Sequence, residues 1–129
     1  LKRAKVFFIV QLIRVYLFMT LNELLQQLES KQIVFKDVLA HIEENYYYTA
    51  SAFTNGTQQN SASENQGSAR VLFFAELNKL TKEQTLSLFA EHYDAVLSTP
   101  EGTDHQNIRQ FMANGWDAVQ FDNDVLSAK

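Results

Sequence analysis

The sequence has no cysteine among its 129 residues, and it has only one proline and four glycines. The absence of cysteine excludes thiol nucleophiles, disulfide frameworks and cysteine-ligated metals. A chain of this length buries roughly two-thirds of the surface that it exposes when unfolded, so a core forms without such cross-links. With 46% apolar residues, the composition is that of one globular domain.

Basic charge is also scarce. The chain carries 11 Lys and Arg side chains against 15 Asp and Glu side chains, for a net charge of −4. Nucleic-acid affinity depends on lysines and arginines that neutralise phosphates. We therefore expect no nucleic acid among the partners of this protein.

No apolar run is long enough to cross a bilayer. The segment from Val6 to Phe18 is apolar at 11 of 13 positions, and Gln11 and Arg14 interrupt it. A spanning helix needs roughly 20 apolar residues. A secretory signal peptide is also disfavoured, because no small-x-small cleavage site follows the run.

The first 18 residues differ from the rest of the chain in composition. They carry a charge of +4 with no acidic residue, whereas residues 19–129 carry −8. A capping-box pattern, Thr20 to Glu23, opens a helix directly after Met19. We therefore expect a basic, apolar N-terminal extension over residues 1–18 and a single domain over residues 19–129. The alternatives for residues 1–18 are an element packed on the core and a native interfacial anchor, and membrane attachment is expected only for an anchor.

Apolar residues recur at helical spacing in several segments. The pattern predicts helices over residues 21–30, 35–46, 69–80 and 82–97, the last opened by a second capping box at Thr81 to Gln84. Pro100-Glu101-Gly102 predicts a turn, followed by a helix that Thr103 or Asp104 caps and Gly115 ends.

The remaining segments predict extended chain and a long loop. Residues 46–53 are aromatic and β-branched, and residues 116–121 roughly alternate, so a short strand pairing is expected between them. Residues 54–68 contain one apolar side chain and predict a functional or disordered loop. The fold class is therefore α+β, mainly α-helical with four to five helices and a small antiparallel β element.

The densest group of catalytic residue types is Asp104-His105-Gln106-Asn107-Ile108-Arg109. At a helix N-terminus, free backbone N–H groups attract an anion, and His105 could serve as an acid or base that Asp104 orients. Arg109, one turn later, could bind a carboxylate or phosphate. The simpler interpretation is that Asp104 caps the helix and the other polar side chains face water.

Other polar and aromatic residues are candidates for ligand binding. Amide and carboxylate side chains suited to sugars or polar metabolites occur in the 54–68 segment, and an aromatic side chain suited to stacking follows the last helix. These candidates are Asn55, Asn60, Glu64, Asn65, Ser68, Asn107, Arg109 and Trp116. A solvated loop and core packing of the aromatic ring are the structural alternatives.

A metal site is not expected. Asp37 and His41 are four residues apart on the second predicted helix, but His92 lacks a carboxylate at a diagnostic spacing and no HExxH motif is present. A surface pair between Asp37 and His41 is the better interpretation. We expect neither a metal nor another cofactor.

Several motifs follow one another in a specific order. They are Phe35-x-Asp37-Val38-x-Ala40-x-Ile42, Tyr46-x-Tyr48-Thr49, Phe53-x-Asn55-Gly56, Asn60-x4-Asn65-x-Gly67-Ser68, Gln84-Thr85-Leu86, and Gly102-x-Asp104-His105-Gln106-Asn107-Ile108-Arg109-x-Phe111-Met112-x3-Trp116. Together they resemble the HopJ (HopPmaJ-like) family of type III effector-like proteins over about Met19 to Lys129. The chain departs from the family pattern at Ala50, where proline is usual, and at Ala69, where cysteine is usual.

The resemblance implies a bacterial protein from a family without an assigned biochemical activity. We favour a non-enzymatic binding or effector module for an unknown protein or small-molecule ligand. The alternative is a small enzyme that uses the Asp104-His105 acid/base pair on a polar or anionic small molecule, so the question of enzyme activity stays open and leans toward no.

The expected location is the bacterial cytoplasm, with type III translocation into a host cell as the alternative. Type III export signals are generally unstructured and poor in acidic residues. The segment after Met19 predicts instead a capped leucine helix that carries Glu23 and Glu29.

Overall fold

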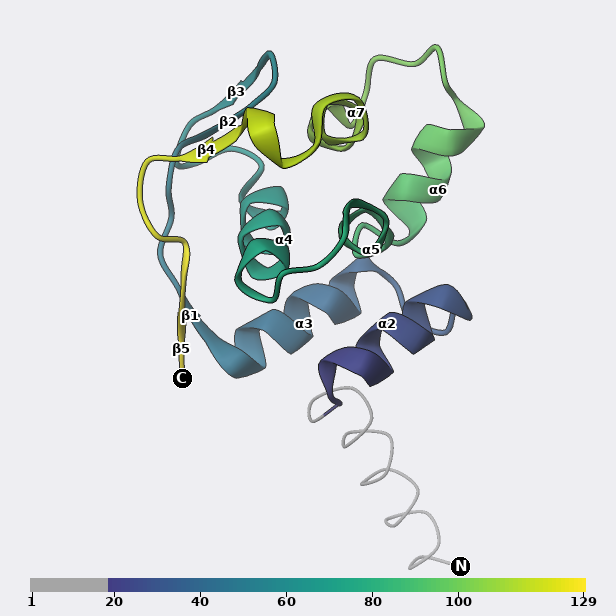
Figure 1. The fold of residues 1–129 in the computed structure, drawn as a ribbon, viewed down its shortest axis with the longest axis vertical. Coiled ribbons are helices and arrows are strands. Elements are labelled where there is room, and N and C mark those ends of the chain that lie inside the picture. The colour runs from purple at the N-terminus through teal and green to yellow at the C-terminus, as the bar shows by residue number, and fades with distance from the viewer. Residues whose placement is uncertain (1–18) are drawn as a thin grey trace, which may run out of the picture.

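The computed structural model describes residues 19–129, which form six α-helices and, along one side of the molecule, two small antiparallel sheets (Figure 1). The expected extension over residues 1–18 lies outside the described residues. In Figure 1, α4 (Gln66–Leu77) lies at the centre, with α3 (Phe35–Asn45) on one side and α7 (Gln106–Asn114) on the other. The predicted class, mainly helical with a small antiparallel β element, is confirmed.

The first two helices match their sequence patterns closely. In α2 (Leu21–Glu29), the Thr20 hydroxyl accepts a hydrogen bond from the Glu23 main-chain N–H (3.2 Å), which confirms the predicted cap. In α3, the Asp37 carboxylate accepts from the main-chain N–H of Val34 (2.9 Å). Each cap satisfies a donor that the first turn leaves free.

The strands are short and come from distant parts of the chain. In one sheet, β1 (Tyr46–Tyr48) pairs with β5 (Leu126–Ala128). In the other, β2 (Phe53–Asn55) lies between β3 (Gln58–Asn60) and β4 (Val119–Phe121). The predicted pairing of the 116–121 segment with the 46–53 segment occurs only at Phe53, which lies opposite Phe121, because the register continues toward Asn55 and not toward β1.

The predicted long loop over residues 54–68 is wrong. It contains the end of β2, a tight turn at Gly56, strand β3 and the first turn of α4. Gly56 adopts φ 59, which the hairpin turn requires and which glycine adopts without strain. The polar composition of this segment gives no sign of these elements, because its buried residues Asn55 and Asn60 bond to Asn107 in the interior of the protein.

The single helix predicted over residues 82–97 is also wrong, since two helices, α5 (Lys82–Ser87) and α6 (Glu91–Ser98), replace it. The break at Ala90 has φ 51 and ψ −123. Helix α5 ends at Ser87, and the N–H groups of Leu88, Phe89 and Ala90 bond to carbonyls three residues earlier, so the chain turns more tightly than an α-helix here. Leu88 and Phe89 in this turn are buried together with Leu86.

Helix α7 begins later than predicted. Its N-cap is His105, and not Thr103 or Asp104, and its first helical residue is Gln106. Gly115 ends it with φ 65, as predicted, and a 3₁₀ turn, η1 (Gly115–Ala118), leads into β4.

The core fills the space between these helices and the three-stranded sheet. Its largest fully buried side chains are the phenylalanines Phe53, Phe74, Phe89 and Phe111. Within residues 19–129, no helix combines the length and the hydropathy that crossing a membrane requires.

The surface pair predicted between Asp37 and His41 is absent. His41 is 5% exposed and its ring lies edge-on to Phe74, with ring centroids 5.8 Å apart. Its Nδ1 atom has no hydrogen-bond partner among the described residues. Burial therefore lowers the pKa of His41 below its usual 6.5.

This burial predicts a pH-dependent stability. Below about pH 6.5 the unfolded state binds a proton at His41 that the folded state does not bind, so the free energy of unfolding should fall as pH falls, until the folded-state pKa is reached. Urea unfolding between about pH 8 and about pH 5.5 should show this slope. The slope should diminish in His41→Leu and persist in His105→Gln, which leaves His41 in place. An unchanged slope in His41→Leu would contradict the assignment.

Candidate functional site

A pocket of about 480 Å³ lies where the first turns of α4 and α7 meet. Its polar wall comes from those turns, from β3 and from α6, and its apolar wall comes from aromatic rings of α3 and the α5–α6 turn. The lining residues are Phe35, Gln58, Asn65, Gly67, Ser68, Phe89, His92, His105, Gln106, Asn107 and Ile108. Four of the predicted site residues, Asn65, Ser68, His105 and Asn107, are among them.

Both helices begin at the pocket without a side-chain cap. Their N-cap residues, Asn65 (φ 52) and His105 (φ 51), have left-handed backbones, and neither side chain bonds to the first turn. Such a conformation is uncommon outside glycine and is often found at functional sites. The uncapped first turns leave main-chain N–H groups and the positive ends of two helix dipoles at one pocket.

Buried asparagines fix these two helix starts. Asn60 and Asn107 form a reciprocal amide pair, with Nδ2 to Oδ1 distances of 3.2 and 3.0 Å. Asn65 donates to Asn60 Oδ1 (2.7 Å), and Asn55 donates to the Asn107 carbonyl (2.8 Å). Asn55, Asn60 and Asn107 are each at most 5% exposed. Low exposure strengthens these bonds and makes losing any one partner costly.

Two histidines face each other at the pocket. The ring centroids of His92 on α6 and His105 before α7 are 5.1 Å apart, with an interplanar angle of 40°. His92 also lies edge-on to Phe35, at 5.0 Å. An imidazole donates a hydrogen bond in its neutral form and carries a positive charge when protonated. Either form suits an anion.

Asp104 does not orient His105. The shortest distance between the carboxylate and the imidazole, from Asp104 Oδ2 to His105 Nε2, is 3.9 Å, which is too long for a hydrogen bond. Arg109 instead donates to Asp104 Oδ1 (2.7 Å), and this hydrogen bond holds the pKa of Asp104 below its usual value. The predicted acid/base pair is therefore not formed in this structure.

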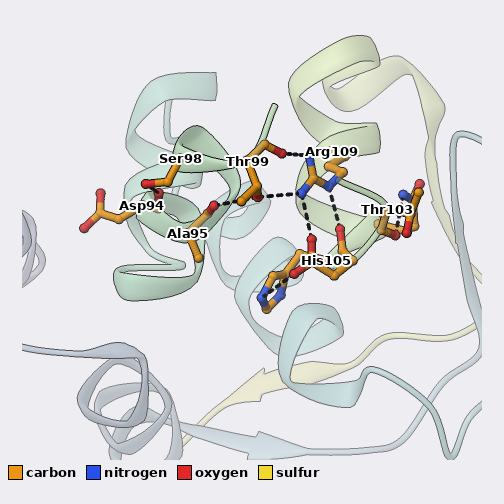
Figure 2. A network of polar contacts seen from close by, with 9 residues as sticks. Asp94, Ala95, Ser98, Thr99, Thr103, His105 and Arg109 are labelled. Carbon is orange, nitrogen blue, oxygen red and sulfur yellow. Dashed lines mark hydrogen bonds and ion pairs between the residues drawn. The ribbon is translucent and has the colours of Figure 1, made fainter. Parts of the chain in front are cut away.

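Arg109 anchors the loop that precedes α7. Figure 2 shows its guanidinium bonded to Thr99 at the end of α6 and to the loop beside His105. Its Nε atom also donates to the Asp104 carbonyl (2.6 Å). With these donors engaged and its side chain only 12% exposed, Arg109 does not line the pocket.

The other predicted site residues lie elsewhere. Asn55 and Asn60 stand behind the pocket in the asparagine network. Glu64 accepts from the Ser61 main-chain N–H (3.1 Å), a bond that lowers the pKa of its carboxyl. The Trp116 ring packs edge-on against Phe111 at 4.9 Å. These four residues make contacts within the fold and do not line this pocket.

Seven further residues line the wall and are not among the predicted catalytic or ligand-binding candidates, namely Phe35, Gln58, Gly67, Phe89, His92, Gln106 and Ile108. The sequence around His92 gives no sign of a site. His92 lies beside His105, which precedes α7, and the sequence does not predict the helix break at Ala90 that comes just before it. Gly67 and Gln106 could have been found, since both belong to the ordered motifs. Among residues 19–129, no group of three potential metal ligands comes together.

The chain is similar to a known protein family and to a solved structure. A family model described as HopJ type III effector protein matches residues 21–126. The crystal structure of VPA0580, a protein of unknown function, is similar, with a TM-score of 0.78 and 47% sequence identity, covering 86% of this chain and 95% of that chain. No curated protein matches the sequence.

The asparagine network predicts a large effect on stability. Asn60→Ala removes partners of Asn65 and Asn107 and leaves buried amide groups unpaired, so the free energy of unfolding should fall by about 2–4 kcal/mol. Denaturant unfolding would measure this loss. The matched control is Gln59→Ala on the exposed side of the same strand, which should change stability by less than about 0.5 kcal/mol. Equal effects of the two substitutions would contradict this role of the network.

Proposed function

We propose that this chain, which belongs to the HopJ type III effector protein family, is a non-enzymatic binding module for a small anion. The observation that carries the proposal is the convergence of two uncapped helix N-termini and two histidines on one pocket. We assign the ligand to this pocket, between α4 and α7.

The main chain supplies the first donors for an anion. Gly67 and Ser68 in the first turn of α4, and Gln106 and Asn107 in the first turn of α7, line the pocket. Residues at these positions have no intrahelical acceptor for their N–H groups. Anions are bound at helix N-termini by such groups together with the dipole.

The side chains supply the remaining donors. His92 and His105 add imidazole N–H groups, and Ser68 and Gln58 add a hydroxyl and an amide. Two carboxylates lie near this set and both are engaged: Asp104 is paired with Arg109, and Glu91 accepts from the Phe35 main-chain N–H (2.7 Å). The pocket therefore offers donors and positive potential to a ligand.

The alternative function, an enzyme with an Asp104-His105 pair, receives less support. Asp104 accepts its hydrogen bond from Arg109 and lies 3.9 Å from His105 at the shortest distance. In the known carboxylate–histidine arrangement, the carboxylate orients the imidazole through a hydrogen bond, and the observed distance is too long for one. The contacts observed fit a binding role better.

We place this function in the bacterial cytoplasm, with type III delivery into a host cell as the alternative. Met19 is 5% exposed and α2 begins with a capped turn directly after it, so this segment is built into the fold. A translocation reporter fused to the chain should show no type III-dependent delivery. Delivery that depends on the secretion apparatus would contradict the cytoplasmic assignment.

Inorganic phosphate is the simplest probe of the pocket. Titration followed by the NMR signals of the histidine imidazoles should show saturable binding, with shifts at His92 and His105 and none at His41. His105→Gln and His92→Gln should each weaken binding by about tenfold or more, because a hydrogen bond to a charged group contributes about 1.5–3 kcal/mol.

Gln59→Ala serves as the control for these variants, because Gln59 is exposed and does not line the pocket. Its phosphate affinity should equal that of the unmodified chain. If phosphate, sulfate and acetate all fail to shift the two imidazoles, the proposal is wrong.

A further inference from the structure

We infer that the ligand of this pocket is a small aromatic phosphate monoester, with its phosphate at the helix N-termini and its ring against Phe35. This inference rests on the proposed function, because it names the chemical class of the anion for the same pocket. Three features of the pocket carry it: its donors, its aromatic wall and its volume.

The donors outnumber the oxygens of a carboxylate. Two helix starts, two imidazoles and the Ser68 hydroxyl converge from separate elements. A carboxylate presents two oxygens, whereas a phosphate monoester presents three terminal oxygens and up to two negative charges. A phosphate therefore uses donors on both helices at once.

The wall beside the first turn of α4 is aromatic. The Phe35 ring stacks on Phe89 with centroids 5.9 Å apart and an interplanar angle of 12°. The His92 ring meets Phe35 edge-on, so the aromatic wall borders the histidine pair. Phe35 is only partly buried, which leaves part of its surface available to a ligand ring. Stacked or edge-on aromatic pairs are favoured beyond the area that they bury.

The volume leaves room for more than the anion. The pocket, at about 480 Å³, is in the range of sites for organic ligands and exceeds what a free phosphate fills. Gly67 packs beside Phe35, since a Cβ atom added there would lie 3.4 Å from Phe35 Cε2, in van der Waals contact with the ring. The first turn of α4 and the Phe35 ring therefore adjoin each other, so a phosphate at the turn and a ring on Phe35 can belong to one small ligand.

Phenyl phosphate, inorganic phosphate and phenol distinguish the parts of this ligand. Isothermal titration calorimetry on the full chain should show phenyl phosphate binding about tenfold more tightly than inorganic phosphate, the upper value of one aromatic contact. Phenol alone, which lacks the anion, should bind more weakly than either phosphate.

Gly67→Ala tests the ring position without loss of the fold. Alanine is favoured over glycine within a helix, so the melting temperature should stay equal or rise. The added methyl group contacts the Phe35 ring and should lower the ratio of the two affinities, phenyl phosphate to inorganic phosphate. Phe35→Leu should lower the same ratio, whereas Gln59→Ala should retain it.

The outcomes separate this inference from the proposed function. If inorganic phosphate binds and phenyl phosphate is no tighter, the aromatic ligand class is wrong and the anion site stands. If neither phosphate binds, both are wrong. Release of phenol from phenyl phosphate would support the ligand class and overturn the non-enzymatic part of the proposed function.

Discussion

A network of asparagine amides, most of them buried, determines where α4 and α7 begin. Asn107 in α7 pairs with Asn60 in β3, and Asn60 accepts from Asn65 at the start of α4. Amides suit this position because each carries donors and an acceptor on one short side chain. The same bonds hold the hairpin, the central helix and α7 together, so the pocket and the fold depend on one set of contacts.

The backbone conformation of the two helix starts lowers the stability of the fold at the pocket. Asn65 and His105 hold left-handed backbones, and a non-glycine residue in that region is destabilised by about 1 kcal/mol or more. The uncapped first turns forgo the stabilisation that Thr20 and Thr81 give to α2 and α5. The amide bonds, and the Arg109 contacts with Thr99 and Asp104, offset this cost and leave the donors of the pocket free for a ligand.

Local sequence signals predicted the elements that local contacts form. The capped starts of α2 and α5 and the glycine end of α7 follow from residues within a few positions of each other. The break at Ala90 did not, because the apolar helical pattern continues through it and only the packed structure shows the positive φ there. The hairpin of β2 and β3 was missed because Asn55 and Asn60 bond to Asn107, far along the chain.

The sequence by itself determined the family, the helical character and the lack of thiol chemistry, and it offered all four residues of the asparagine network as candidates. Only the tertiary structure decided their roles. Asn60 and Asn107 are 47 residues apart in the chain, and Arg109 was a candidate for an anion until its guanidinium proved to be engaged by Thr99 and Asp104. A residue type sets which bonds a side chain can make, but packing brings the partners together, and the donors left unpaired after packing define the site.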